Sequence, residues 1–250
     1  MNLRSEQDIF RAAQLPHFLA IAALSLKIDP ENIEAQVGLA AMQLALAAVT
    51  APDDHLERFA AAEANLMQVL SRAPEHALAH LNLGVIQIHT NRAGQGVGEC
   101  ERALTLNRNL AAAHGFIGLA KVFLGRSEET EAHVREALRL SPRDYLAHVW
   151  LTFAGVAKLY LGFDEEAVSH FRRAIEMNKS FPIAHFYLAA ALAKLGRHFE
   201  VVAAVRAGRA LDPKFAVSRW RDTAPSDDPT FLAQHERVLA AMRLAGVPEE

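Results

Sequence analysis

Hydrophobic and small residues recur along the chain at separations of four and three, the spacing that keeps side chains on one face of an α-helix. Five such sets follow one another with the same internal spacing. They are Ala62, Leu66 and Val69; Gly96, Cys100 and Ala103; Thr130, Val134 and Ala137; Ala167, Phe171 and Ala174; and Val201, Val205 and Gly208. Each set predicts an amphipathic helix whose apolar stripe packs on a neighbouring element.

A turn with the same pattern lies between successive units. Its central position is proline in four copies and Arg or Lys in two, at Pro30, Pro74, Arg108, Pro142, Lys179 and Pro213, so that the steps are 44, 34, 34, 37 and 34 residues. Small residues such as Gly84 and Gly118 follow ten residues later, where they let two helices approach closely. A further glycine, at Gly94, Gly125, Gly162 and Gly196, marks a left-handed turn between two antiparallel helices.

Departures from the period predict local differences. The long step contains about ten extra residues within 48–59, where Pro52, Asp53 and Asp54 indicate a loop or the restart of a helix. The three extra residues after Pro142 are close to one helical turn, which predicts a longer first helix around Tyr145–Leu161. The first unit is incomplete, and Pro16 lies where a helix would begin.

The repeating unit resembles the tetratricopeptide repeat (TPR), whose 34-residue pattern it matches. The resemblance implies an all-α fold, a right-handed α-α superhelix with a C-terminal capping helix. The expected divisions are 1–32, a partial N-terminal repeat or cap; 33–215, five repeats; and 216–250, the cap helix and tail. The five repeats are expected at about 33–76, 77–110, 111–147, 148–181 and 182–215.

The sequence after Pro213 no longer follows the repeat pattern. Its pattern predicts a terminal helix, which a solenoid needs to cover its last apolar face. Asp228 is placed as its N-cap, Pro229 as its first residue and Gly246 just past its end. The expected inner stripe is Phe231, Val238, Leu239 and Met242, with Trp220 as an anchor where the chain crosses.

Composition narrows the function classes. Half of the residues are hydrophobic but only 7% are aromatic, and Ala and Leu dominate, which favours helices. The net charge of −3 is spread along the chain, so direct nucleic-acid binding is not expected. No secretory signal and no apolar run long enough for a membrane are apparent, and the single Cys100 excludes an internal disulfide framework. A cytoplasmic protein is predicted.

Four histidines, His80, His114, His148 and His185, form a ladder with intervals of 34, 34 and 37 residues. Equivalent residues of stacked helices point in parallel at helix spacings of about 8–10 Å. Ligands of one metal must instead converge to about 2.0–2.1 Å from it. The ladder therefore predicts packing histidines, each with one hydrogen-bonded nitrogen, rather than metal ligands.

Other candidate chemistry is weak. The stretch "GQGVGE" at 94–99 lacks the spacing and the preceding strand of a nucleotide fingerprint, and predicts a turn glycine followed by two glycines that weaken a helix. Cys100 occupies an apolar position of its repeat, which indicates a buried, inert thiol. The acidic clusters at 127–131 and 164–166 suit helix N-termini. No enzyme, cofactor or metal site is predicted, and a small-molecule or metal-binding enzyme remains a rival class.

The first helices of a TPR array line a concave groove, which the resemblance places at fourteen positions. They are Leu78, Leu81, Val85, Ile88, His89, Leu119, Val122, Phe123, Val156, Leu159, Tyr160, Ile183, Phe186 and Lys194. The Lys, Asn and Arg set with which some members hold the acidic C-termini of chaperones is missing. This lining suits an apolar or amphipathic helix, or an adjacent domain. Alternatively, these residues pack on one another.

Residues 65–250 also resemble the TPR region of a bacterial group in which such arrays follow an adenylate cyclase domain or a winged-helix DNA-binding domain. The resemblance rests on residues 137–197 followed by "LDPKF", "SRWR", "DDPTFL" and "MRLAGVPE". It implies a regulatory part of a signalling protein whose effector domain would lie outside this sequence. Two functions are thus expected: a non-catalytic scaffold that binds a protein or peptide partner, or such a regulatory region acting on an effector in cis.

Overall fold

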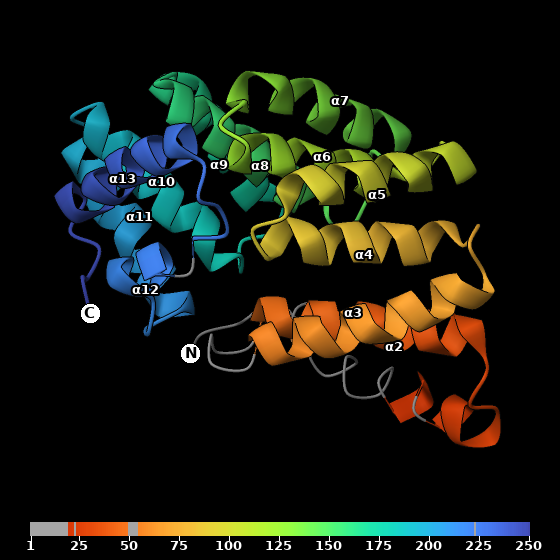
Figure 1. Ribbon diagram of the computed structural model, residues 1–250. Helices are drawn as coiled ribbons and strands as arrows, with labels where there is room; N and C mark the ends of the chain where they lie inside the picture. Colours follow the sequence, from red (N-terminus) through yellow and green to blue (C-terminus); the bar gives the residue numbers. More distant parts are fainter. Residues whose placement is uncertain (1–19, 23, 50–54, 223) are drawn as a thin grey trace. The chain divides into compact units, whose positions relative to one another are not determined.

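The computed structural model describes residues 20–22, 24–49, 55–222 and 224–250, in which the regular elements are helices and no β-strand occurs. The chain divides into two compact units, Met1–Ala113 and His114–Glu250. The expected helix start at Pro16 and the loop or restart at Pro52, Asp53 and Asp54 lie outside the described residues. Figure 1 shows the helices as successive pairs joined by short turns.

In the first unit, helix α2 (Ile33–Val49) packs on α3 (His55–Arg72), and α4 (Ala77–His89) packs on α5 (Ala93–Leu106). The apolar stripes predicted from the sequence form the contacts, since Ala62, Leu66 and Val69 of α3 are fully buried. Close approach of α4 and α5 depends on small residues. A Cβ atom added to Gly84 would lie 2.8 Å from both the Gly96 carbonyl oxygen and the Cys100 Sγ.

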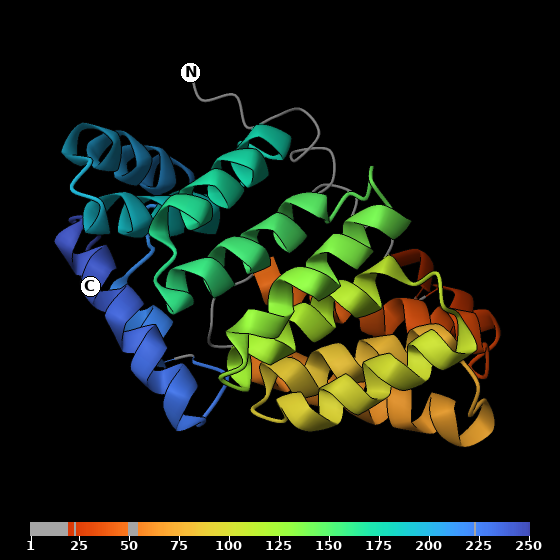
Figure 2. The same cartoon turned by 90° about the horizontal axis from the view of Figure 1, so that it is seen from above.

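Helix α6 (Ala111–Phe123) begins in the first unit and continues into the second. A 3-10 turn, η2 (Ser127–Glu129), leads from it to α7 (Thr130–Leu140). Two further pairs follow, α8 (Ala147–Leu161) with α9 (Asp164–Met177) and α10 (Pro182–Lys194) with α11 (His198–Leu211). The antiparallel course within each pair can be followed in Figure 2.

The second-helix stripes of this unit are buried as predicted. On α7 the predicted residues are at most 3% exposed: Thr130, Val134 and Ala137. On α9 they are fully buried: Ala167, Phe171 and Ala174. On α11, Val201 and Gly208 are buried and Val205 is half-buried. The spacing of four and three residues therefore identified the packed face of the second helix in each pair.

Three of the four predicted turn glycines adopt left-handed backbone, Gly125 with φ +70°, Gly162 with φ +84° and Gly196 with φ +70°. The prediction for Gly94 is wrong, because α5 has already begun at Ala93 and Gly94 is helical. The left-handed residue of that turn is Asn91 with φ +57°. Asparagine is among the few residues that tolerate this region, and so the turn closes without a glycine.

The first helix after Pro142 is longer than the first helices α4, α6 and α10, as predicted: α8 has 15 residues and each of these has 13, although α2 has 17. It begins at Ala147 rather than at Tyr145. The reason is local, since the Leu146 amide donates to the Asp144 carboxylate at 2.9 Å and holds the preceding residues in a turn.

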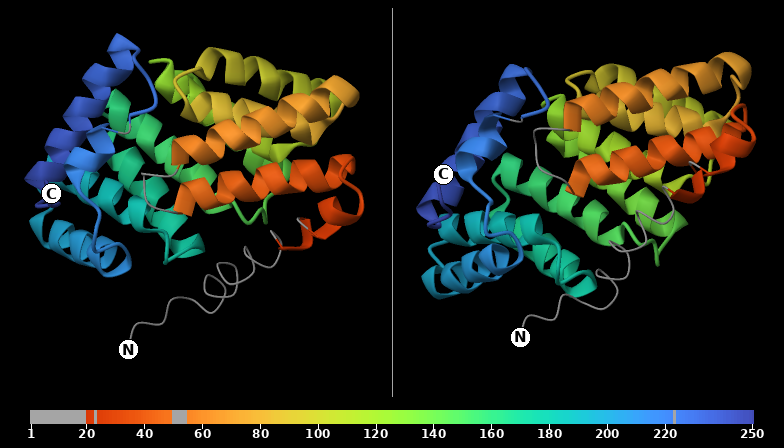
Figure 3. Two further views of the ribbon diagram at one scale, coloured as in Figure 1. Left: turned by 60° about the horizontal axis from the view of Figure 1, so that its bottom comes forward. Right: turned by 90° about the horizontal axis from the view of Figure 1, so that it is seen from below.

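Two more helices complete the second unit, the short α12 (Val217–Asp222) and α13 (Pro229–Leu244). Helix α13 begins and ends as the sequence indicates: the Asp228 carboxylate accepts from the Phe231 amide at 2.8 Å, and Gly246 follows the helix with φ +81°. Its predicted stripe of Phe231, Val238, Leu239 and Met242 is at most 2% exposed. Figure 3 shows α13 and α12, in shades of blue, at the C-terminal end of the colour sequence.

Candidate functional site

The fourteen residues predicted to line a groove differ in exposure, and most are inaccessible. Three are half-buried, His89, Phe123 and Ile183, while Leu78 and Lys194 are exposed. The other nine are buried: Leu81, Val85, Ile88, Leu119, Val122, Val156, Leu159, Tyr160 and Phe186. These nine do not line an open groove in the described structure. Five of them, Val122, Val156, Leu159, Tyr160 and Phe186, belong to one hydrophobic core, and the alternative interpretation is that the predicted residues pack on one another.

In the second unit the covering element is the C-terminal part of the chain itself. Helix α13 packs on α10 and α8, and residues of all three share one hydrophobic core with Val122 of α6. The Phe231 ring meets the Phe123 ring edge to face at 5.5 Å and lies 5.9 Å from the Tyr160 ring. Phe186 is covered in the same way, because the Phe215 ring stacks on it at 4.0 Å. We call the surface formed by Phe123, Ser127 and Tyr160, with the adjoining α8 and α10, the α13-binding face.

One buried polar contact fixes α13 on this face. The Tyr160 hydroxyl lies 2.7 Å from Nδ1 of His235, and the His235 ring stacks on Phe231 with centroids 5.2 Å apart. Burial lowers the pKa of His235 and raises the pKa of Tyr160 well above its ordinary value. Both side chains are therefore neutral near pH 7. This avoids the cost of burying a charge.

The segment that leads into α13 is held by hydrogen bonds to the same face. The Ser226 hydroxyl donates to the Phe123 carbonyl at 2.6 Å, and the Ser127 hydroxyl donates to the Gln234 side-chain carbonyl at 3.4 Å. Gly125 leaves space for this approach, because a Cβ atom there would lie 2.5 Å from the Asp228 carboxylate. These contacts join residues about 100 positions apart and have no sequence signature, and so the sequence did not predict them.

The histidine ladder holds turns in place. His185 Nε2 lies 3.1 Å from the Lys179 carbonyl, and His80 Nε2 lies 2.9 Å from the Pro74 carbonyl, in each case six residues earlier. His148 Nε2 accepts from the Asn178 side-chain amide at 3.1 Å. His185 and His148 agree with the prediction of packing histidines with a hydrogen-bonded nitrogen, whereas both nitrogens of His80 are bonded, since its Nδ1 lies 2.6 Å from a Glu99 carboxylate oxygen. His114 differs, because its Nδ1 is buried without a hydrogen-bond partner in the described structure.

Replacing His185 by leucine tests this role. The change keeps a similar volume but removes the hydrogen bond to the Lys179 carbonyl, and so we expect the free energy of unfolding to fall by about 1 kcal/mol. Urea denaturation followed by circular dichroism measures it. The matched control is His198→Leu, at an exposed position, which should change the stability by less than about 0.5 kcal/mol. Equal effects of the two substitutions would contradict the interpretation.

Other candidate chemistry is structural where the chain is described. Cys100 is fully buried, and burial raises the pKa of its thiol to about 12, so it is no nucleophile at neutral pH. The glycines of "GQGVGE" all lie inside α5, which corrects the predicted turn at Gly94. Gly96 packs on α4, since a Cβ atom there would lie 2.5 Å from the Gly84 carbonyl oxygen. Among the described residues no cluster of His, Cys, Asp or Glu could hold a metal.

None of the helices that the structure describes is both long and apolar enough to cross a bilayer.

The described surface carries several ion pairs between neighbouring helices. Lys158 of α8 pairs with Glu131 and Glu166 at 2.8 and 2.6 Å, and Lys194 of α10 pairs with Asp164 at 2.6 Å. Lys194, a predicted groove residue, is thus part of the contact between successive helix pairs.

Comparisons with known proteins agree with this architecture. The family model of the tetratricopeptide repeat matches residues 56–112 and 154–214, just under half of the chain. No curated protein sequence is significantly similar. Among solved structures, TTC0263, a thermophilic TPR protein of Thermus thermophilus, is 21% identical, with a TM-score of 0.56 over 74% of this chain and 94% of its own.

Two other solved structures are similar at the level of the fold. A chain of the APC/C hetero-tetramer Cut9–Hcn1 is 16% identical with a TM-score of 0.63, over 94% of this chain and 51% of its own. The MamA protein is 15% identical with a TM-score of 0.51, over 70% of this chain and 92% of its own. The fold is therefore an all-α helical repeat solenoid, and the family model and the solved structures together support tetratricopeptide repeats within it.

Proposed function

We propose that this protein is a non-catalytic interaction scaffold whose first helices bind an amphipathic helix of a partner. The main support for this proposal is α13 itself, which lies on α8 and α10 with its apolar stripe fully covered. An array of paired helices offers such a surface to any helix with a matching stripe. In this chain α13 occupies the α13-binding face, and a partner helix would compete with it there.

The contacts of α13 define the chemistry of such a partner. Phe231, His235, Val238 and Met242 are buried and spaced by four, three and four residues, the pattern of one helical face. An aromatic residue would enter the space between Phe123 and Tyr160, and a hydrogen-bonding group one turn later would reach the Tyr160 hydroxyl. We propose that the half-buried Phe123 and Ile183 are the predicted groove residues that a partner contacts first.

A peptide of residues 226–248 tests the proposal against the full chain. The substitutions Phe231→Glu and Leu239→Glu in the protein place charges on the buried stripe and should release α13, since burying an unpaired charge is costly. We expect this released variant to bind the fluorescein-labelled wild-type peptide at least tenfold more tightly than the unaltered chain does, as measured by fluorescence anisotropy. A peptide with the same two substitutions should not bind.

A matched control carries Leu232→Glu and Ala240→Glu, at exposed positions of α13 with the same spacing of eight residues. This control should bind the peptide no better than the unaltered chain. Circular dichroism must show that the released variant keeps the repeat helices. Failure of that folded variant to bind the peptide at 100 μM would refute a helix-accepting face.

The remaining expectations belong to the same proposal: no catalysis, no cofactor, no direct contact with nucleic acid, and a cytoplasmic location. The comparisons bring no support for the link to adenylate cyclases or winged-helix regulators, which stays an alternative prediction. In that alternative the α13-binding face would serve an effector domain in cis. Heat released on titration of the folded chain with Zn²⁺ or nucleotides would instead favour the enzyme class.

A further inference from the structure

Helix α11 carries an uncovered face at the end of the second unit. Phe199 is 96% exposed and Val202 is 69% exposed, and Arg206 and Arg209 continue the same face at spacings of four and three. The opposite face, with Val201, is buried against α10. Neighbouring large apolar side chains on one exposed helical face are typical of an interaction surface.

Two hollows lie along this face and join at Arg209 and Pro213. The larger, of about 590 Å³, is bounded by Val202 and Val205 of α11 and by Ala245 at the end of α13. The smaller, of about 480 Å³, continues past Pro213 to Phe215. We call the two hollows together the α11 groove. Leu244, which precedes Ala245, is 70% exposed and adds apolar surface at its edge.

The α11 groove is lined by more cations than anions. Arg206, Arg209, Lys214 and Arg219 contribute positive charge, while Glu250 is the carboxylate among the lining residues of the two hollows. Arg206, Arg209 and Lys214 form no ion pair with any residue that the structure describes. Among the described lining residues, Glu250 is thus the carboxylate that faces these three cations.

Cations on nearby surfaces of the same unit behave differently. Arg172 of α9 pairs with Glu200 of α11, and Arg243 of α13 pairs with both Glu236 and Glu249 at 2.8 Å. Carboxylates thus pair with the cations beside the groove, whereas the lining of the two hollows holds four cationic side chains and Glu250. The surplus charge inside the groove is complementary to an acidic ligand.

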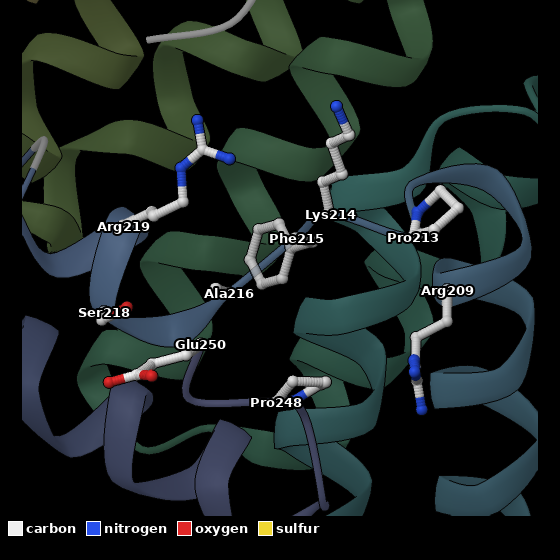
Figure 4. A pocket seen from close by; sticks show the side chains of 9 residues that line it. All are labelled: Arg209, Pro213, Lys214, Phe215, Ala216, Ser218, Arg219, Pro248 and Glu250. Carbon is white, nitrogen blue, oxygen red and sulfur yellow. The ribbon is translucent and has the colours of Figure 1, made fainter. Parts of the chain in front are cut away.

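The arrangement of the charges separates a small anion from a longer ligand. Figure 4 shows Arg209 and Lys214 on the two sides of Pro213, with Arg219 beyond the ring of Phe215. The side chain of Arg209 points away from that of Lys214 (Figure 4). Because the cationic groups are spread along the groove and do not converge on one point, the geometry favours a row of carboxylates over a single phosphate or sulfate.

We propose that the α11 groove binds an acidic amphipathic helix of a partner protein. Apolar side chains of that helix lie on Val202 and Val205, and its carboxylates pair with Arg206, Arg209 and Lys214. The face from Phe199 to Arg209 spans about 15 Å, or roughly three helical turns, which is enough to fix the direction of a partner helix. This surface is distinct from the α13-binding face, but the end of α13 borders it, and so its test uses the unaltered chain with α13 in place.

The test uses the full chain and a labelled 21-residue helical peptide with one leucine stripe flanked by glutamates. A peptide with lysine in place of every glutamate is its matched partner. Fluorescence anisotropy in 50 mM NaCl should show binding of the acidic peptide alone. The double variant Arg206→Glu/Arg209→Glu and the single variant Val202→Glu should each weaken binding at least tenfold, and 500 mM NaCl should also weaken it.

The control variant is Arg173→Glu, which reverses an exposed cation of α9 that makes no ion pair with a described residue and should leave binding unchanged. Equal binding of the lysine peptide, or unchanged binding by the double variant, would overturn the proposal. Sedimentation of the protein alone gives a further check. A dimer that the double variant abolishes would overturn the proposal too, because it would assign the groove to a second copy of this chain.

Variants that release α13 allow the two proposals to be tested separately. The variant Phe231→Glu/Leu239→Glu should gain affinity for the 226–248 peptide. When Arg206→Glu and Arg209→Glu are added to this released variant, its affinity for the 226–248 peptide should stay unchanged. Loss of acidic-peptide binding on reversal of these two arginines, with the 226–248 peptide unaffected, would support the α11 groove whatever becomes of the other proposal.

Discussion

Replacing Phe171 by alanine is expected to lower the free energy of unfolding by about 3–5 kcal/mol, the usual cost of removing a fully buried phenylalanine. Its ring fills the contact between α8 and α9 and stacks on Tyr187 of α10 at 5.6 Å. Truncation leaves a cavity that three helices line. Urea denaturation measured by circular dichroism should show the loss. Phe199→Ala, at a 96% exposed position, should cost less than about 0.5 kcal/mol.

A second substitution at the same contact makes the prediction sharper. A Cβ atom added to Gly155 would lie 2.5 Å from the Phe171 ring, so Gly155→Ala alone should cost about 1–3 kcal/mol through overpacking. In the background of Phe171→Ala the added methyl group instead enters the cavity. We expect the double variant to be more stable than the sum of the single effects by at least about 1 kcal/mol. Simple additivity would contradict the described contact.

Acidification from pH 7 to pH 5 is expected to destabilise the protein through histidines that are buried or half-buried. Burial lowers the pKa of His89 to about 4, helped by the nearby charge of His55, and burial also lowers the pKa of His170, His185 and His235. Because the unfolded chain binds protons with a pKa near 6.5, it takes up more protons than the folded chain below that pH. Stability present above pH 6.5 is therefore lost as the pH falls toward 4.

For His89 alone the expected loss at pH 5 is of the order of 2 kcal/mol, from its pKa of about 4 in the folded state. The His89 ring stacks on Phe59 with centroids 6.1 Å apart, so that His89→Phe keeps an aromatic ring in the contact. Urea denaturation at pH 7 and pH 5 should show a smaller acid-induced loss in that variant by about this amount. If the two proteins lost the same free energy of unfolding between pH 7 and pH 5, His89 would not be a cause of the acid destabilisation.

The repeat helices were predictable because each depends on its own stripe and on the neighbouring turn. The face of α9 with Ala167, Phe171 and Ala174 follows from a spacing of four and three residues, and it is buried. The turn at Gly125 follows from the glycine itself. Where another residue type replaces the expected one the prediction failed, as at Gly94, because Asn91 already provides the left-handed residue.

The candidate site was less predictable, since exposure depends on contacts between distant parts of the chain. The sequence identified the stripe of α13 and its N-cap at Asp228, but not the surface on which it lies. Tyr160 was assigned to an open groove, whereas its hydroxyl lies 2.7 Å from His235, 75 residues later. No periodic pattern reports such a pairing. The cations of the α11 groove were missed for a related reason, because Arg206 lines one hollow and Lys214 the other, and no periodic pattern places them on one surface.

The position of α13 has a consequence for how the second unit folds. An array in which each helix pair meets only the next one can lose its end pair while the remainder persists. Here one late segment ties together helices formed up to 100 residues earlier, through Ser226 and Phe123 at one end and Met242 at the other. That closure raises the sequence separation of native contacts, which slows folding. We therefore expect residues 114–250 to unfold as one cooperative block rather than to fray from α13.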